Sequence, residues 1–229
     1  MKNKQIRRVL TTVASIVLLS ANAAAEFNGY AILTSDYVFR GVTFIDGSPA
    51  ARLGAEVSFE NGIYAGALAS TIDIGNGAGH QRDLEVNYYA GFRVDLSDSW
   101  SLAATAIAYT YPGADTVFDY DYEEILLALN YNDSVWLEYA NSPDYETHNV
   151  ELYAEAPLPW TMTVGAGVGW HDVSAISNLD YVYWQAGLTR HFTVVDIDLR
   201  YYDTSRWVPP ISNEERAESR VVLSARIQF

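Results

Sequence analysis

Apolar and polar residues alternate along almost the whole chain after its first 26 residues, with the period of two that is typical of β-strands. In the last such run, residues 221–229, every odd position is apolar and the polar side carries Arg226. The run at 82–96 follows the same rule and has Glu85 and Arg93 on its polar side. Each strand is therefore expected to have one apolar face and one polar face.

These alternating runs predict about twelve strands and no amphipathic helix of useful length. Tight turns follow every second strand, and the intervening connections are mostly longer and polar. Short turns on one rim and longer loops on the other are typical of an up-and-down antiparallel β-barrel of the bacterial outer membrane. The expected strands lie near residues 27–40, 50–60, 62–73, 82–96, 99–111, 120–131, 134–141, 147–156, 160–171, 180–192, 194–203 and 218–229.

A soluble β-sandwich is the competing interpretation, because its strands also alternate between an apolar and a polar face. The two folds differ in which face meets water, since a membrane barrel shows its apolar face to lipid. Aromatic residues gather on the apolar face beside the short turns, as in the interfacial girdle of a membrane barrel. This pattern favours the all-β transmembrane barrel. The aromatic residues of the predicted girdle are Phe59, Trp100, Tyr131, Trp160, Phe192 and Phe229.

Residues 1–25 have the features of a cleaved secretory signal peptide rather than of a transmembrane helix. Four basic residues and no acidic residue precede the small-residue cleavage site Ala23-Ala24-Ala25, and a short apolar core lies between them. Residues 26–229 are then expected to form one barrel domain. Removal of the peptide takes the net charge from −15 to −19 and leaves arginine without lysine. Such an acidic chain is not expected to bind nucleic acid, because phosphates require a surplus of positive charge.

The stretch SDYVFRGVT, residues 35–43, has the composition of the outer part of the first strand. Tyr37 and Phe39 would face lipid, whereas Asp36 and Arg40, at even spacing, would face the lumen. An arginine that faces lipid near the bilayer midplane costs about 2–4 kcal/mol, so the inward orientation of the charges is preferred. Both charges are therefore expected to lie in the lumen.

Charged residues are frequent on the polar faces of the predicted strands, and carboxylates outnumber arginines there. One interpretation is a structural network in which arginine forks bind carboxylates and fill a narrow interior. The other is a cation-preferring pore lined by the surplus of acid. The residues expected to line the pore are Asp36, Arg40, Arg52, Glu56, Glu85, Arg93, Asp196, Asp198, Arg200 and Arg226, and the same faces carry Asp95, Glu124, Glu138, Glu151 and Glu155.

The stretch SDYVFRGVT also resembles the TorF-type family of proteobacterial porins. Elsewhere the resemblance rests on chain length, the strand pattern, the signal peptide and the aromatic C-terminus. It implies an outer-membrane barrel with a channel role and no catalytic residues, and it does not define a solute. The resemblance is most specific at Ser35, Asp36, Tyr37, Phe39, Arg40 and Gly41.

Signals for catalysis are weak in this sequence. The chain has four histidines and no G-x-S-x-G motif, and the remaining enzymatic possibility is His171 paired with an inward serine. The acidic stretch DYDYEE, residues 119–124, has oxygen ligands for Ca²⁺ or Mg²⁺, but its spacing matches no calcium loop and a solvated acidic rim is the favoured interpretation. We therefore expect neither an enzyme nor a bound cofactor.

The sequence thus predicts a narrow, passive and cation-preferring outer-membrane channel for ions or small polar solutes. The alternative is a closed structural barrel that binds a surface partner, in which the final long loop, residues 203–219, binds that partner or folds inward as a constriction. Expected partners are outer-membrane lipid, lipopolysaccharide and the barrel assembly machinery, for which the terminal Phe229 is the expected assembly signal.

Overall fold

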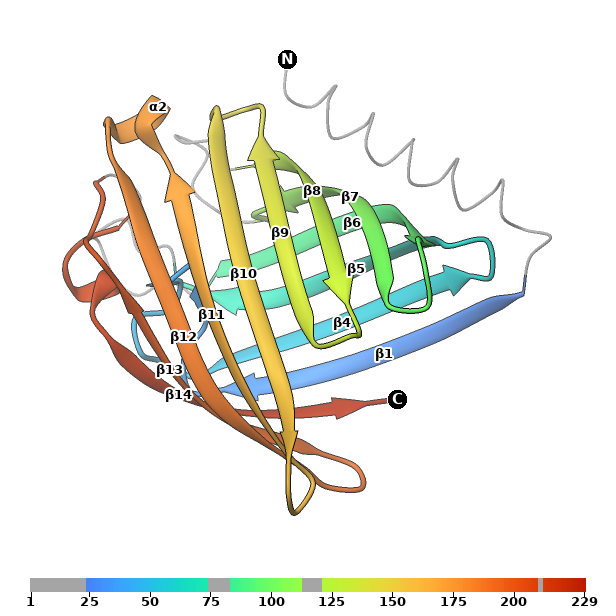
Figure 1. The fold of residues 1–229 in the computed structure, drawn as a ribbon. Helices are drawn as coiled ribbons and strands as arrows, with labels where there is room; N and C mark the ends of the chain where they lie inside the picture. Colours follow the sequence, from blue (N-terminus) through green and yellow to red (C-terminus); the bar gives the residue numbers. More distant parts are fainter. Residues whose placement is uncertain (1–23, 74–82, 113–120, 210–211) are drawn as a thin grey trace.

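The computed structural model describes residues 24–73, 83–112, 121–209 and 212–229. Twelve antiparallel strands of this described part form one closed barrel (Figure 1). They are β1 (Ala25–Thr34), β4 (Ala50–Phe59), β5 (Ile63–Ile72), β6 (Asp83–Asp95), β7 (Trp100–Thr110), β8 (Tyr122–Tyr131), β9 (Val135–Ser142), β10 (Thr147–Leu158), β11 (Met162–Asp172), β12 (Asp180–His191), β13 (Asp196–Thr204) and β14 (Arg220–Gln228). Closure occurs where β1 pairs with both β4 and β14.

The predicted twelve-stranded, up-and-down barrel is confirmed. Tight turns such as residues 60–62 and 132–134 join strands at one end, which we call the short-turn rim. We call the opposite end the mouth. The first strand is shorter than predicted, because β1 ends at Thr34 instead of continuing to residue 40. Residues 1–23 lie outside the described residues, so the signal peptide stays a prediction.

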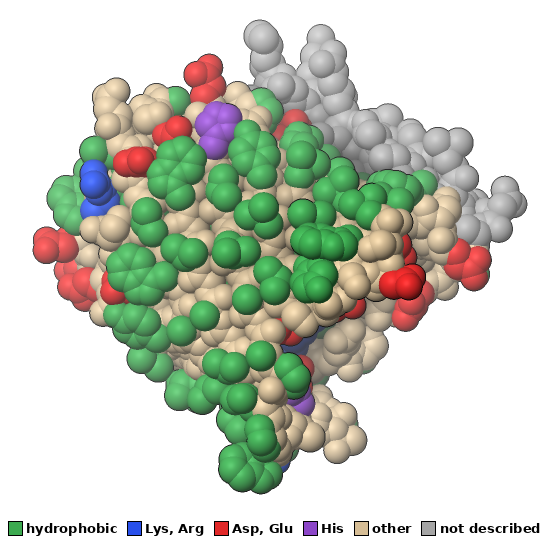
Figure 2. Space-filling model, in the orientation of Figure 1, with side chains coloured by type: hydrophobic (Ala, Val, Ile, Leu, Met, Phe, Trp, Pro, Cys, Tyr) green, Lys and Arg blue, Asp and Glu red, His purple; other side chains and the backbone are tan. Residues whose placement is uncertain are grey.

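The outer wall of the barrel is apolar. Leu53, Leu199 and Leu223 are 58%, 52% and 53% exposed, and Figure 2 shows hydrophobic side chains spread over the visible wall. A band of this kind suits contact with lipid, because burying apolar surface away from water is favourable. Five of the six predicted girdle residues are exposed at or beside the short-turn rim, namely Trp100, Tyr131, Trp160, Phe192 and Phe229.

Two apolar clusters of buried residues lie in the interior at the mouth, on opposite sides of the lumen. One cluster joins Ile72 of β5 to Tyr109 of β7, and the other joins Val173 to Tyr181 and Tyr183 of β12. Two short helices, α2 (Ser174–Ser177) and η1 (Glu215–Ala217), also lie in the mouth connections. Within the described residues, no helix is long and apolar enough to cross a membrane.

Tyrosine rings lie against glycines of the neighbouring strand on the inner wall. A side chain added at Gly54 would collide with the ring of Tyr30, and one added at Gly169 would collide with the ring of Tyr183. Glycine leaves room for a large aromatic neighbour in a curved sheet. The Tyr183 hydroxyl also donates a hydrogen bond to the Glu151 carboxylate at 2.9 Å. The inner wall therefore positions polar groups as well as apolar surface.

Candidate functional site

The connection between β1 and β4, residues 35–49, folds into the barrel as a hairpin, which we call the inner hairpin. Its arms are β2 (Val38–Phe39) and β3 (Val42–Thr43), and its turn is Arg40-Gly41 with φ values of 49° and 80°. Positive φ at both central residues is the geometry of the tightest hairpin turns. An added Cβ on Gly41 would lie 2.6 Å from the Cβ of Tyr183, so the tip packs closely against β12.

The inner hairpin corrects the expectation that Tyr37 and Phe39 face lipid. Tyr37 is 5% exposed in the cluster that includes Tyr109, and Phe39 packs against the same cluster. The Tyr37 hydroxyl donates to the Glu85 carboxylate at 3.1 Å. Burial and the charge of Glu85 raise the pKa of Tyr37 well above its ordinary value, so the hydroxyl stays a donor. Alternation misleads here because the chain leaves the barrel sheet after Thr34.

Arg40 and Glu124 form an ion pair that ties the hairpin tip to β8. Two guanidinium nitrogens donate to the two carboxylate oxygens at 2.7 and 2.9 Å, which is a bidentate geometry. The side chains are only 7% and 2% exposed. Burial alone would lower the pKa of the Arg40 guanidinium, but the charge and hydrogen bonds of Glu124 raise it above its ordinary value. Arg40 thus lies inside the barrel as a buried ionic contact.

Asp36 is held at the base of the inner hairpin by Arg220 of β14. The guanidinium donates to one carboxylate oxygen at 2.6 Å, and the Thr43 hydroxyl donates to the other. Arg220 was not among the residues expected to line the lumen. The signal was present, because continuing the alternation of the last strand two residues back from Val222 puts Arg220 on its inner face.

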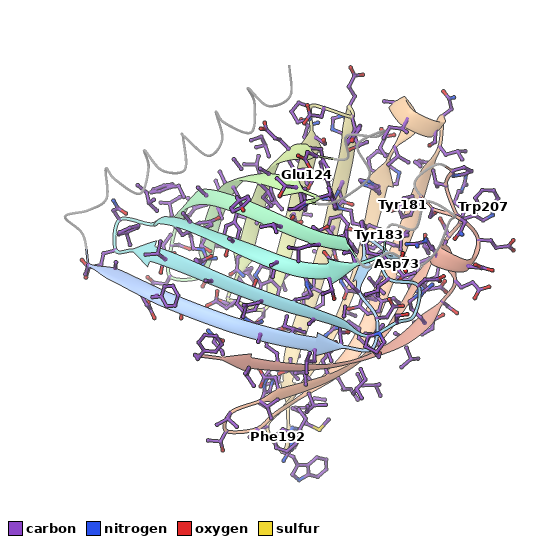
Figure 3. All side chains as sticks on the ribbon, turned by 180° about the vertical axis from the view of Figure 1, so that it is seen from behind. Asp73, Glu124, Tyr181, Tyr183, Phe192 and Trp207 are labelled. Carbon is purple, nitrogen blue, oxygen red and sulfur yellow. The ribbon has the colours of Figure 1, made fainter. Side chains whose placement is uncertain are left out.

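The described residues of the last connection, 205–209 and 212–219, pack onto the inner hairpin in the mouth. Arg216 donates to the backbone oxygens of Thr43 and Asp73 at 3.3 and 2.9 Å. Val208 is fully buried in the cluster that also contains Val42 of β3. Figure 3 shows Asp73, Glu124, Tyr181 and Tyr183 at this end of the barrel and Phe192 at the other. The inner hairpin therefore crosses the lumen, and the connection between β13 and β14 packs against it.

A cavity of about 440 Å³ lies inside the barrel, between the inner hairpin and the short-turn rim. Its walls come from β1, β4, β12, β13, β14 and the hairpin. Six of the ten residues expected to line a pore border this cavity, namely Asp36, Arg52, Asp196, Asp198, Arg200 and Arg226. The other four do not line it, and these are Arg40, Glu56, Glu85 and Arg93.

The four residues outside the cavity have other surroundings. Glu56 accepts a hydrogen bond from Tyr89 at 3.0 Å. Glu85 accepts one from Asn87 at 2.9 Å in addition to that from the inner hairpin. Arg93 is exposed on β6 towards the short-turn rim. These charges are therefore spread over the lumen and do not form one continuous ladder.

Each carboxylate that borders the cavity already has a partner. Asp36 is ion-paired at the hairpin base, as described above. Asp198 accepts two hydrogen bonds from Arg200, at 3.2 and 2.9 Å. Asp196 lies 2.9 Å from Nδ1 of His191. The acids of this cavity are thus engaged by neighbouring side chains.

Arg52 and Arg226 also border the cavity, and each lies over a tyrosine ring. The guanidinium carbon of Arg52 is 4.3 Å from the ring centre of Tyr37, and that of Arg226 is 4.9 Å from the ring centre of Tyr30. Within the described ranges, neither guanidinium is ion-paired with a carboxylate. We call the inner face of β4, β1, β14 and β13 the arginine wall, after Arg52, Arg200, Arg220 and Arg226.

The opposite side of the lumen is acidic. Glu138 and Glu151 are directly opposite each other in the pairing of β9 with β10, and no arginine or lysine occurs in β8, β9 or β10. Glu151 accepts hydrogen bonds from neutral donors, including Gln185 at 2.8 Å. We call this face the acidic wall, and its members are Glu124, Glu138, Glu151 and Glu155.

The geometry around His171 does not support the enzymatic site that the sequence left open there. His171 meets the ring of Tyr181 edge-on, and its Nδ1 has no hydrogen-bond partner among the described residues. A hydrogen-bonded chain does run from Thr163 through His191 to Asp196, with both links at 2.9 Å. Its imidazole and carboxylate are 43% and 41% exposed, whereas triad chemistry depends on a water-excluded site. The chain fixes the imidazole at the short-turn rim.

Solved porin structures have a similar fold. The KdgM porin in complex with disordered oligogalacturonate matches with a TM-score of 0.58 at 9% identity, over 90% of this chain and 98% of that chain. The KdgM porin by itself matches with a TM-score of 0.55 at 10% identity, over the same shares. At this level of identity the likeness is one of fold alone. Comparison with curated proteins gives no match.

The family comparison covers nearly all of the barrel. One family model, described as a bacterial protein of unknown function, matches residues 19–220. The narrower resemblance to TorF-type porins stays a prediction. The closed barrel of twelve strands is thus the fold of a chain that belongs to the Gcw_chp family of bacterial proteins.

Proposed function

We propose that this protein is a passive, narrow channel for ions or small polar solutes. The observation that carries the proposal is the charged cavity inside a closed barrel whose outer wall is apolar. A barrel of this type has its backbone hydrogen bonds satisfied between strands, so it is stable in lipid while its lumen stays polar. Solutes would diffuse past the inner hairpin, which narrows the mouth.

We propose that the channel prefers cations. The acidic wall supports this, because its strands have no arginine or lysine, and among the described residues the arginine paired to it, Arg40, comes from the inner hairpin. The net charge of −15 for the whole chain points the same way. Fixed carboxylates raise the local concentration of cations and repel anions over a distance of about 8 Å at physiological salt.

We propose the bacterial outer membrane as the location, with outer-membrane lipid and lipopolysaccharide around the barrel. Export would use the signal peptide, and insertion would use the barrel assembly machinery. Phe229 is our candidate assembly signal. Its support is that it is 68% exposed and that its backbone exchanges hydrogen bonds of 2.7 and 2.8 Å with Gly29 at the closure of the barrel.

Planar-bilayer recording of the refolded residues 26–229 tests the proposal. We expect discrete conductance steps and, in a potassium chloride gradient, a reversal potential of the sign that cation preference requires. Steps with a reversal potential of the opposite sign would overturn the cation preference alone. Silence from a folded, membrane-inserted protein would overturn the channel.

A closed structural barrel that binds a surface partner is the second candidate. The inner hairpin favours it, because its tip is bonded to β8 and packed against β12, on two sides of the lumen. The two candidates differ in the effect of releasing the hairpin. A channel conducts before the release and conducts more after it, whereas a closed barrel conducts only after it.

A further inference from the structure

We propose that the arginine wall holds a binding site for small organic anions with two carboxylate groups, formed by Arg52 and Arg226. The proposal goes beyond the cation-preferring channel, because it assigns a site for anions, and it does not depend on conduction. Binding itself is a separate property of the cavity. The site lies between the inner hairpin and the short-turn rim, away from the acidic wall.

The strand register puts the two arginines at one level of the barrel. Ile32 of β1 pairs with Arg52 on one side and with Arg226 on the other. Neighbouring strands are about 4.8 Å apart, so the two Cα atoms are separated by about 10 Å. Both side chains are on the concave face of the sheet and border the same cavity. Two guanidinium groups at this spacing suit two carboxylates on one small molecule.

Both guanidinium groups have hydrogen-bond donors to spare. Each guanidinium carbon lies over a tyrosine ring, and this contact occupies no N–H donor in a hydrogen bond. Arg52 donates from Nε to Ser70 at 3.2 Å, which occupies one of its five donors. Carboxylates are the natural partners of such edges, because two parallel hydrogen bonds form at once.

The acids of the cavity form no ion pair with Arg52 or Arg226 within the described residues, although Asp196 is directly opposite Arg226 in the pairing of β13 with β14. Asp198 is bonded to Arg200, and Asp196 is bonded to His191. The third carboxylate belongs to the hairpin base and faces Arg220. The lining therefore holds three carboxylates and three arginines, and Arg52 and Arg226 are the two of these arginines that have no ion pair within the described residues.

The remaining lining suits a small, partly apolar acid. Ile32, Val38 and Val222 provide apolar surface, and the hydroxyls of Thr34 and Ser224 lie between the arginines and the mouth. The cavity volume of about 440 Å³ is within the range of pockets that bind small molecules. A short aliphatic dicarboxylate fits this combination of two charged ends and an apolar middle.

Titration calorimetry of the refolded protein in detergent tests the site, with glutarate as the probe and the neutral glutaramide as its control. We expect glutarate to bind and glutaramide not to bind. Arg52→Gln and Arg226→Gln should each weaken glutarate binding at least roughly ten-fold, which is the loss of one charge-assisted hydrogen-bonded pair. Arg190→Gln is the matched control, because Arg190 is on the outer face of β12, over the ring of Phe192.

Two further results decide the proposal if a variant folds poorly. Arg52→Lys keeps the charge and should bind glutarate more tightly than Arg52→Gln, whereas equal binding by both would overturn the site. Equal affinity of the parent protein for glutarate and glutaramide, or equal weakening by Arg190→Gln and Arg226→Gln, would also overturn it.

Bilayer recordings separate this proposal from the channel function. Glutarate binding by a protein that does not conduct would support the site and overturn the channel. Conductance by a protein that does not bind glutarate would leave the channel in place and overturn the site.

Discussion

The two walls of the lumen are built from the same kind of strand but treat charge in opposite ways. On the acidic wall, Glu138 and Glu151 stand opposite each other with no arginine or lysine in their strands. On the arginine wall, the carboxylate Asp198 has its own arginine, and Arg52 and Arg226 are left over. A lumen with an excess of acid therefore contains two arginines that form no ion pair among the described residues. Strand register, rather than composition, decides which charges are paired.

The inner hairpin connects the two walls. Its base is ion-paired with Arg220 on the arginine wall, and its tip is ion-paired with Glu124 on the acidic wall. Each end thus brings a charge opposite to that of the wall it meets. Any change that frees the hairpin removes this connection and leaves the two walls facing each other across open solvent.

Arg40→Ala is expected to have the largest effect, because it removes the ion-pair partner of the buried Glu124 and leaves that carboxylate with the hydrogen bond from Tyr109 at 3.2 Å. Removing one member of a buried ion pair costs about 3–5 kcal/mol. Since Glu124 is 2% exposed, we expect either a loss of this size in the free energy of unfolding or release of the hairpin from the lumen. Denaturant titration in detergent measures the first, and an increase in single-channel conductance measures the second.

The double variant Arg40→Met with Glu124→Leu is the control for that experiment. It removes both charges and keeps apolar volume in their place, which is often neutral for a buried ion pair. We expect it to recover most of the lost stability. A double variant as unstable as Arg40→Ala would mean that the ion pair itself, and not the orphaned charge, carries the energy.

Gly41→Ala compared with Gly47→Ala separates the packing of the hairpin tip from its backbone strain. Both glycines have positive φ, 80° and 71°, so both alanine variants carry the cost of a left-handed residue, about 1–2 kcal/mol. Only Gly41 has a neighbour in the way, since its Cβ would lie 2.6 Å from Tyr183. We expect Gly41→Ala to be less stable than Gly47→Ala by about 1–3 kcal/mol, the cost of overpacking. Equal losses in denaturant titration would mean that the tip is loosely held.

Tyr37→Phe tests the base of the hairpin more gently. The change keeps the ring under Arg52 and removes only the hydrogen bond to Glu85. Glu85 keeps its hydrogen bond from Asn87, so we expect a loss of about 1.5 kcal/mol, the low end for a bond to a charged group. Tyr89→Phe removes a similar bond to Glu56 outside the hairpin and should cost stability without changing conductance. Conductance changes of equal size in both variants would contradict a special role for the hairpin.

The barrel was predictable because its signal is repeated. Twelve runs of period two, tight turns after every second run and aromatic residues beside those turns all indicate one architecture. The inner hairpin was not predictable from the same signal. Residues 35–43 continue the strand-like composition of β1, and alternation does not reveal that the chain turns inward after Thr34. The Arg40-Gly41 pair is an unusual sequence for this turn, because asparagine-glycine is the common one.

The candidate site was predictable in its residue types and not in its pairing. Sequence parity selected Asp198, Arg200 and Arg226, and all three border the cavity. An odd or even position in a strand decides which face of the sheet a residue occupies. Ion pairing between side chains depends on which strands are neighbours and on the register between them. The ion pair between Asp36 and Arg220 joins residues at opposite ends of the chain, which meet only when the barrel closes.

Opposite shifts in ion selectivity are the smallest expected effects, and they test the contrast between the walls most directly. Glu138→Gln should lower the permeability ratio of cation to anion, and Arg226→Gln should raise it. Two charges 4 Å apart in water interact by about 1 kcal/mol, so each shift should be at most roughly five-fold and should shrink as salt rises. Reversal potentials in a potassium chloride gradient measure both, with Arg190→Gln on the outer face as the variant that should not shift. If both lumen variants moved the reversal potential in the same direction, the two walls would not act as separate regions of opposite charge.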